Sequence, residues 1–140
     1  MIIVDTNVVS ELMKPHPDAA VIAWAARQSR DDLATTSITK AEVLYGIARL
    51  PDGRRRSALA DAADRMFGVD FGGRVLSFDG PAAISYATIV SARERSGHSI
   101  KTLDALIAAI AATAGAAIAT RNVRDFEGSG IRVVNPWTAS

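Results

Sequence analysis

Hydrophobic residues along the chain form short continuous runs, separated by longer stretches in which they recur at helical spacing. The runs predict five strands, over residues 1–4, 33–37, the neighbourhood of residue 76, 116–120 and 131–134. A run that is apolar at every position, such as MIIV at the start, is typical of a strand buried on both faces, as in a parallel sheet. The sheet is therefore expected to be internal and covered by helices.

Helices are predicted between these strands, because start and stop signals bracket the intervening stretches. Pro81 suits the first turn of a helix, and Gly115 suits the residue that closes one. The predicted helices cover residues 8–13, a stretch after Asp18, 39–50, 54–67, 81–97 and 103–114. Strands that alternate with helices predict a three-layer α/β/α sandwich with a mostly parallel sheet of four or five strands, formed as a single domain by residues 1–140.

Two of these helices also show which face is expected to be buried. Asp18 is the predicted N-cap of a helix whose apolar face includes Val21, Ile22 and Trp24. Thr39 is the predicted start of another helix, whose apolar stripe is Val43, Leu44, Ile47 and Leu50.

Composition narrows the class of protein. The 140 residues are 49% hydrophobic and 22% charged, with a formal net charge of +1, so any basic surface for nucleic acid must be local. The chain has no cysteine, which excludes disulfides, thiolate catalysis and Cys-type zinc sites. The start lacks a signal peptide's basic segment, and the longest uncharged stretch, residues 105–120, is shorter than the ~20 residues of a membrane span. A cytoplasmic protein without membrane contact is expected.

Four acids occupy the places where predicted strands and helices meet. Asp5 closes the first strand, Asp125 follows the fourth, and Glu42 and Asp104 fall in the predicted first turns of two helices. If the strands are parallel, the first and fourth end at the same edge of the sheet, where open α/β sheets bind their ligands. Converging carboxylates repel one another unless a cation neutralises them, and an all-oxygen cluster suits Mg²⁺ or Mn²⁺. The pattern favours metal-assisted phosphoester chemistry.

Each acid also has an ordinary structural explanation. Glu42 completes the capping-box pattern Thr39-x-x-Glu42, and Asp104 complements the positive end of a helix dipole. Asp125 lies in a loop, where aspartate is common. Asp5 is harder to explain in this way, because a carboxylate at the end of a buried strand is costly unless it is paired or binds metal.

The polar neighbours strengthen the functional interpretation. Thr6 and Asn7 follow Asp5, while Thr120 ends the fourth strand and Asn122 comes shortly after it. Two strand exits therefore carry the same combination of acid, hydroxyl and amide groups.

At this point the chain resembles a known family, the PIN domain, in the form found in VapC and FitB-type toxins. The resemblance rests on the segments IIVDTNVVSEL, TTSITKAEVLYGI, LDALIAAIA and ATRNVRDFEGSGIRVVNPW, in the family's order. It implies that Asp5, Glu42 and Asp104 are the three core catalytic and metal-binding acids and that Asp125 is the fourth. It also matches Asn122 to the asparagine of the family's T-x-N motif.

The resemblance implies an endoribonuclease that depends on Mg²⁺, with Mn²⁺ as a substitute, and that is the toxin of a type II toxin–antitoxin system. Water would attack the phosphodiester in line and leave 5′-phosphate and 3′-hydroxyl ends. Thr6, Asn7, Thr120 and Asn122 would orient the ligands. The implied partners are RNA, a VapB- or FitA-like antitoxin and a second copy in a homodimer, which together with the antitoxin could bind operator DNA.

Substrate phosphates require cations near such an acidic pocket. Lys40, Lys101, Arg121 and Arg124 flank the candidate site in sequence, although helix-end and surface charge explain each of them equally well. Two rival hypotheses remain: a catalytically silent RNA- or partner-binding module, and an aspartyl-phosphate domain, which would want Asp-x-Asp where this chain has Asp5-Thr6-Asn7. The RNA target, the number of metal ions and direct or water-mediated binding by Glu42 stay open.

Overall fold

The sheet of the molecule is fully parallel, as the continuous apolar runs predicted. A computed structural model describes residues 1–139. Its strands are β1 (Ile2–Val4), β2 (Leu33–Thr36), β3 (Val75–Leu76), β4 (Ala117–Ala119) and β5 (Val133–Val134). They form one five-stranded sheet in the order β3-β2-β1-β4-β5, with every neighbouring pair parallel. The order changes direction at β1, so the carboxyl ends of β1 and β4 flank the switch point at which such sheets bind ligands.

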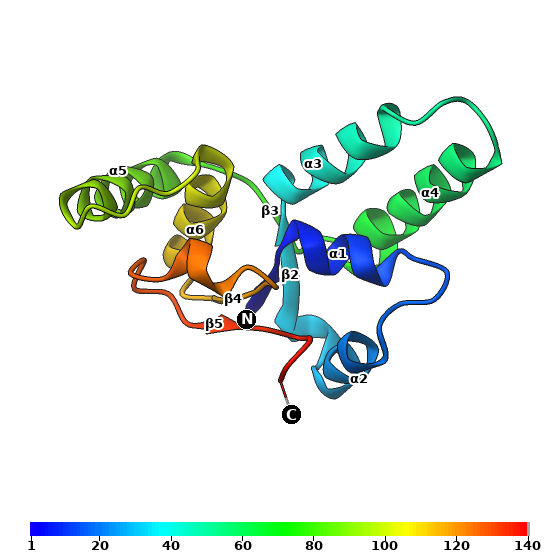
Figure 1. The fold of residues 1–140 in the computed structure, drawn as a ribbon, viewed down its shortest axis with the longest axis horizontal. Helices are drawn as coiled ribbons and strands as arrows, with labels where there is room; N and C mark the ends of the chain where they lie inside the picture. Colours follow the sequence, from blue (N-terminus) through cyan, green and yellow to red (C-terminus); the bar gives the residue numbers. More distant parts are fainter. Residues whose placement is uncertain (140) are drawn as a thin grey trace.

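Helices cover both faces of this sheet (Figure 1). The α-helices are α1 (Thr6–Leu12), α2 (Ala19–Arg27), α3 (Ser37–Ala48), α4 (Arg54–Arg65), α5 (Gly80–Arg95) and α6 (Thr102–Ala114). Short 3-10 turns are η1 (Arg30–Asp32) and η3 (Val123–Phe126), and η2 (Met66–Asp70) is a π-helical turn. α5 and α6 lie on one side of the sheet, and α1, α2 and α4 lie on the other. The expected three-layer α/β/α sandwich is confirmed.

Two hydrophobic cores fill the spaces between these layers. Side chains alternate between the faces of a strand, so Ile3 enters one core and Val4 the other. Ile3 packs with α6, whose buried positions are mainly alanine and isoleucine and allow the helix to lie close to the sheet. Val4 packs with Val8 and Val9 of α1. Both faces of β1 are therefore buried, and its carboxyl end lies between the two cores.

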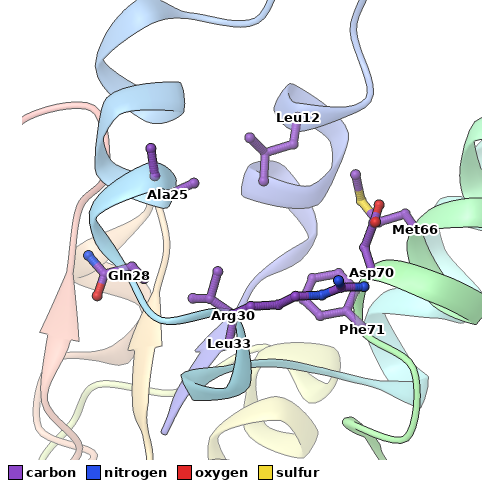
Figure 2. Close-up of a pocket in the computed structure, with 9 residues that line it drawn as sticks. Leu12, Ala25, Gln28, Arg30, Leu33, Met66, Asp70 and Phe71 are labelled. Atoms are coloured by element: carbon purple, nitrogen blue, oxygen red, sulfur yellow. The ribbon is translucent and has the colours of Figure 1, made fainter.

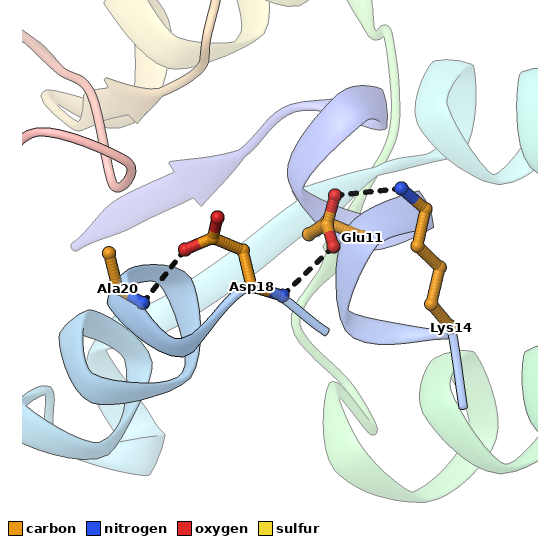
Figure 3. Close-up of polar contacts among 4 residues, drawn as sticks. All are labelled: Glu11, Lys14, Asp18 and Ala20. Atoms are coloured by element: carbon orange, nitrogen blue, oxygen red, sulfur yellow. Dashed lines mark hydrogen bonds and ion pairs between the residues drawn. The ribbon is translucent and has the colours of Figure 1, made fainter. Parts of the chain in front are cut away.

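Helix boundaries follow local signals at most positions. Asp18 accepts a 2.8 Å hydrogen bond from the Ala20 N–H and caps α2, as predicted. Gly115 ends α6 at φ 64°, a left-handed conformation that suits glycine. Glu11, buried near the end of α1, accepts bonds from the Lys14 ammonium and the Asp18 N–H and so ties α1 to the start of α2 (Figure 3).

The predicted start of α3 at Thr39 is wrong. Thr36 is the N-cap, with extended φ/ψ of −126° and 158°, and its hydroxyl accepts a 3.1 Å bond from the Thr39 N–H. β2 runs in extended form to Thr36, so the helix begins at the next residue. Glu42 consequently lies in the second turn of α3, and neither its first-turn placement nor the Thr39-x-x-Glu42 capping box survives.

The predicted apolar faces were also too wide. Val21 and Trp24 of α2 are buried, as are Val43 and Ile47 of α3, but Ile22 is 46% exposed and Leu44 is 40% exposed. Neighbouring residues differ by about 100° around a helix. A narrow contact with the core therefore buries Val21 but not Ile22, and Val43 but not Leu44.

In the described residues 1–139, no helix is both long and apolar enough to cross a membrane.

Candidate functional site

Asp5 lies where the two central strand ends meet. Its backbone N–H donates a 2.9 Å hydrogen bond to the Ala119 carbonyl, which extends the pairing of β1 with β4. Its carboxylate accepts 2.8 Å bonds from the Thr6 N–H at Oδ1 and from the Thr120 hydroxyl at Oδ2. The first and fourth strands thus bring an acid and a hydroxyl together, as the sequence predicted.

The charge state of Asp5 reflects two opposing effects. Its side chain is buried, and burial raises the pKa of the carboxyl above its ordinary value, against the lowering effect of the bonds from Thr120 and Thr6. The negative charges of Glu42 and Asp125 raise this pKa further. A nearby cation would stabilise the charged form of a carboxylate that is buried and repelled in this way.

Glu42 reaches the same place from α3. Its Oε1 accepts a 2.8 Å hydrogen bond from the Thr6 hydroxyl, which also lies 3.1 Å from the Thr39 hydroxyl. Thr6 therefore connects the two acids: its N–H binds Asp5 and its hydroxyl binds Glu42. The Glu42 carboxylate contacts α1 instead of the start of its own helix.

Asp104 and Asp125 complete the group. Asp104 lies in the first turn of α6, as predicted, and Asp125 lies in η3 beyond β4. Burial, followed by the charges of Asp5, Asp125 and Glu42, raises the pKa of Asp104 to about 6, although Lys101 opposes the shift. Because each of the other three acids perturbs Asp104, the four share one electrostatic environment.

The four acids do not form a tight cage. Within residues 1–139, no three His, Asp or Glu side chains are close enough together to hold an ion by themselves. Mg²⁺ usually keeps several waters and takes only one or two protein carboxylates directly, so this spacing suits a hydrated ion. The donors are all oxygens, and burial together with the neighbouring carboxylates raises the pKa values of Asp5 and Asp104, an effect that a divalent cation would offset. The residues present fit Mg²⁺ or Mn²⁺.

Amide and hydroxyl groups brace the two strand exits against each other. The Asn7 amide donates a 3.2 Å bond to the Thr120 hydroxyl and accepts a 3.1 Å bond from the Arg121 N–H. Asn122 joins this network through its backbone N–H, which binds the Thr120 hydroxyl at 3.1 Å. Thr120 thus contacts Asp5, Asn7 and Asn122 at once.

The four candidate RNA-binding cations Lys40, Lys101, Arg121 and Arg124 are all exposed. Lys101 precedes α6 and acts electrostatically on Asp104. The guanidinium of Arg121 lies 4.9 Å from the centre of the Trp137 ring, a cation–π contact that the sequence did not reveal. The contact of Thr39 with Thr6 and the burial of Arg93 were also missed, because the sequence neighbours of both residues resemble those of ordinary helical residues.

A separate cavity lies away from the four acids. A space of about 500 Å³ opens near the start of β2 and is lined mainly by apolar side chains, among them Leu12, Leu33, Met66 and Phe71 (Figure 2). None of the four acids borders it. A smaller cavity of about 280 Å³ between α1, α3 and α4 does include Glu42, so the acidic site continues into a groove on that side.

Known proteins are similar to this chain in sequence and in fold. The family model of the PIN domain matches residues 2–127. "VapC ribonuclease Y4jK" of Sinorhizobium fredii is 41% identical over 137 residues, which is 98% of each chain. "Toxin FitB" of Neisseria gonorrhoeae is 36% identical and covers 98% of this chain and 99% of its own. The structure of FitAB bound to an IR36 DNA fragment superposes with a TM-score of 0.93 at 36% identity, over 100% of this chain and 98% of that one.

Proposed function

This chain belongs to the PIN-domain family, with relatives of the VapC and FitB type, and we propose that it is a metal-dependent endoribonuclease, the toxin of a toxin–antitoxin pair. The observation that carries the proposal is the shared environment of Asp5, Glu42, Asp104 and Asp125 at the switch point of the sheet. This grouping of charges supports catalysis through the four acids. In the same proposal, residues 1–140 act as one domain.

Asp5 and Asp104 are the residues that would hold a first Mg²⁺ or Mn²⁺, and Asp125 and Glu42 would serve a second. When bound, the ion would supply the charge that activates water and neutralises the phosphodiester, leaving 5′-phosphate and 3′-hydroxyl ends. The protein's own contribution is orientation. Thr120 and Thr6 each donate a 2.8 Å bond that fixes the rotamer of Asp5 or Glu42 before substrate arrives.

Exposed cations would hold the RNA backbone on either side of these acids. Lys101 is best placed, because its charge already reaches Asp104. Lys40, Arg121 and Arg124 would contact phosphates farther along the strand. The side chains next to the acids are neutral hydroxyls and amides. The RNA backbone would therefore be attracted mainly by the four exposed cations.

The partners follow from the relatives. One is named a VapC ribonuclease, another is named a toxin, and FitAB is bound to DNA. For this chain we propose a cytoplasmic homodimer, silenced by a VapB- or FitA-like antitoxin, which as a complex binds operator DNA.

The test is cleavage of RNA by the purified, antitoxin-free protein, with sequencing of the ends produced. Cleavage should require Mg²⁺ or Mn²⁺, stop with chelator and leave 5′-phosphates. Asp5→Asn should abolish it while the fold persists, and Asp61→Asn, at an exposed position on α4, is the matched control. RNA binding without cleavage would point to the silent module, and a stable beryllium fluoride adduct on Asp5 would point to the phosphoacceptor.

A further inference from the structure

Arg93 is a buried cation without an acidic partner. It lies in the last turn of α5, only 6% of it is exposed, and it takes part in none of the ion pairs formed within residues 1–139. A charge removed from water is costly unless other groups satisfy it. Here backbone carbonyls do so, and no carboxylate takes part.

The carbonyls come from two separate segments of the chain. Nε donates to the His98 carbonyl at 2.6 Å and Nη2 to the Ser99 carbonyl at 3.4 Å. Nη1 donates to the Asp125 carbonyl at 3.3 Å and also to the Glu127 carbonyl. One side chain therefore fastens the α5–α6 link to η3.

Both of these segments present residues of the acidic site. The α5–α6 link leads into α6, whose first turn carries Asp104. η3 carries Asp125 itself, and apart from the Arg93 bonds it is anchored in the core by Phe126, which is 1% exposed. A turn of four residues has few internal bonds, so its position depends on such outside anchors.

We propose that Arg93 is a positioning residue that holds Asp125 in register with Asp104 and thereby sets the affinity of the site for a divalent cation. The inference rests on the proposed function. A metal ligand on a short turn binds well only if it is already placed, because ordering it during binding lowers the affinity. Charge-assisted bonds to the turn's own carbonyls are strong enough to supply that placement.

The experiment measures Mn²⁺ affinity by calorimetry in a double-mutant cycle between Arg93→Gln and Asp125→Asn. Arg93→Gln should weaken Mn²⁺ binding by about tenfold, in the range seen when groups that orient metal ligands are removed. In the Asp125→Asn background, Arg93→Gln should cause no further loss. Arg95→Gln, at an exposed position in the same helical turn, is the matched control and should bind Mn²⁺ as the wild type does.

Two results would overturn the inference. One is unchanged Mn²⁺ affinity in Arg93→Gln, and the other is an equal loss with and without Asp125, which would mean that Arg93 supports only the fold. If Arg93→Gln does not fold, Arg93→Lys replaces it in the cycle, because lysine keeps the charge but reaches fewer carbonyls. Failure of the wild type to bind Mn²⁺ would overturn the proposed function as well, whereas normal binding that Asp5→Asn removes would leave that function standing.

Discussion

The hydroxyl of Thr120 donates a 2.8 Å hydrogen bond to Oδ2 of Asp5, across 115 positions of sequence. Parallel pairing of β1 with β4 sets this contact, since Val4 and Ala119 are partners in register. The bond lowers the pKa of Asp5, whose burial raises it. Thr120 thus helps to keep a buried carboxylate charged.

Thr120→Val should therefore reduce activity more than it reduces stability. The valine keeps the shape but removes the donor, so the pKa of Asp5 rises and less of the carboxylate is available at a given pH. We expect a loss of about tenfold in kcat/KM near neutral pH and a shift of the acidic limb of the pH–rate profile to higher pH. Thr120→Ser, which keeps the hydroxyl, should retain the wild-type profile. An unshifted acidic limb in Thr120→Val would contradict this role.

Asp104 should make the metal-free protein less stable as the pH rises. Its pKa in the folded state is about 6, above the ordinary value of 3.8. Well below pH 3.8 the group is protonated in both states and has no effect. Between the two pKa values the unfolded chain is ionised while the folded one keeps its proton, so stability falls, and well above pH 6 the penalty is constant. The half-exposed position limits its size, because solvent screens the neighbouring charges.

Asp104→Asn should consequently melt at a higher temperature than the wild type at pH 7.5 in chelator, and at the same temperature at pH 3. Thermal unfolding at the two pH values measures this directly. Asp61→Asn, at an exposed position on α4, which carries none of the four site acids, should show no such pH-dependent difference. An equal change at both pH values would mean that the effect is packing and not charge.

Sequence patterns predicted the strands and the parallel sheet, because burial and chain reversal leave strong local signals. They also singled out four acids whose charges act on one another in the structure, whereas the catalytic role of these acids stays a prediction. The start of α3 was not predictable in the same way. Thr36 and Thr39 are both good N-caps, and the choice depends on how far β2 stays extended beside its neighbours. Arg93 looks like Arg95 in sequence, and only the folding of two distant segments over it makes it buried.

Glu11 should contribute stability that is lost in acid. The bond from Lys14, followed by that from the Asp18 N–H, holds the pKa of Glu11 below its ordinary value of 4.5. Its contribution is therefore fully present above about pH 4.5 and disappears as the pH falls through the lowered folded-state pKa. Glu11→Gln keeps an acceptor for Asp18 but loses the charge. Denaturant unfolding should show the variant to be less stable than the wild type at pH 7, with the difference shrinking below pH 4.

Asp70→Asn provides the comparison for Glu11, because this exposed acid on η2 forms no side-chain ion pair within residues 1–139. Its stability difference from the wild type should stay near zero across the same pH range. A Glu11→Gln difference that is independent of pH would show that shape, and not charge, connects α1 to α2.

Lys101→Met should weaken RNA binding and also alter the acidic site. Lys101 is exposed beside α6, and its charge lowers the pKa of Asp104, which the other acids raise. Loss of the charge should reduce the slope of log affinity against log salt by about one, the value for one phosphate contact, and should raise the pKa of Asp104 further. RNA affinity is measured at several salt concentrations with the cleavage-deficient Asp5→Asn protein, and Lys101→Arg should keep the original slope. A slope that stays the same in Lys101→Met would remove Lys101 from the RNA-binding surface and leave it only an electrostatic effect on Asp104.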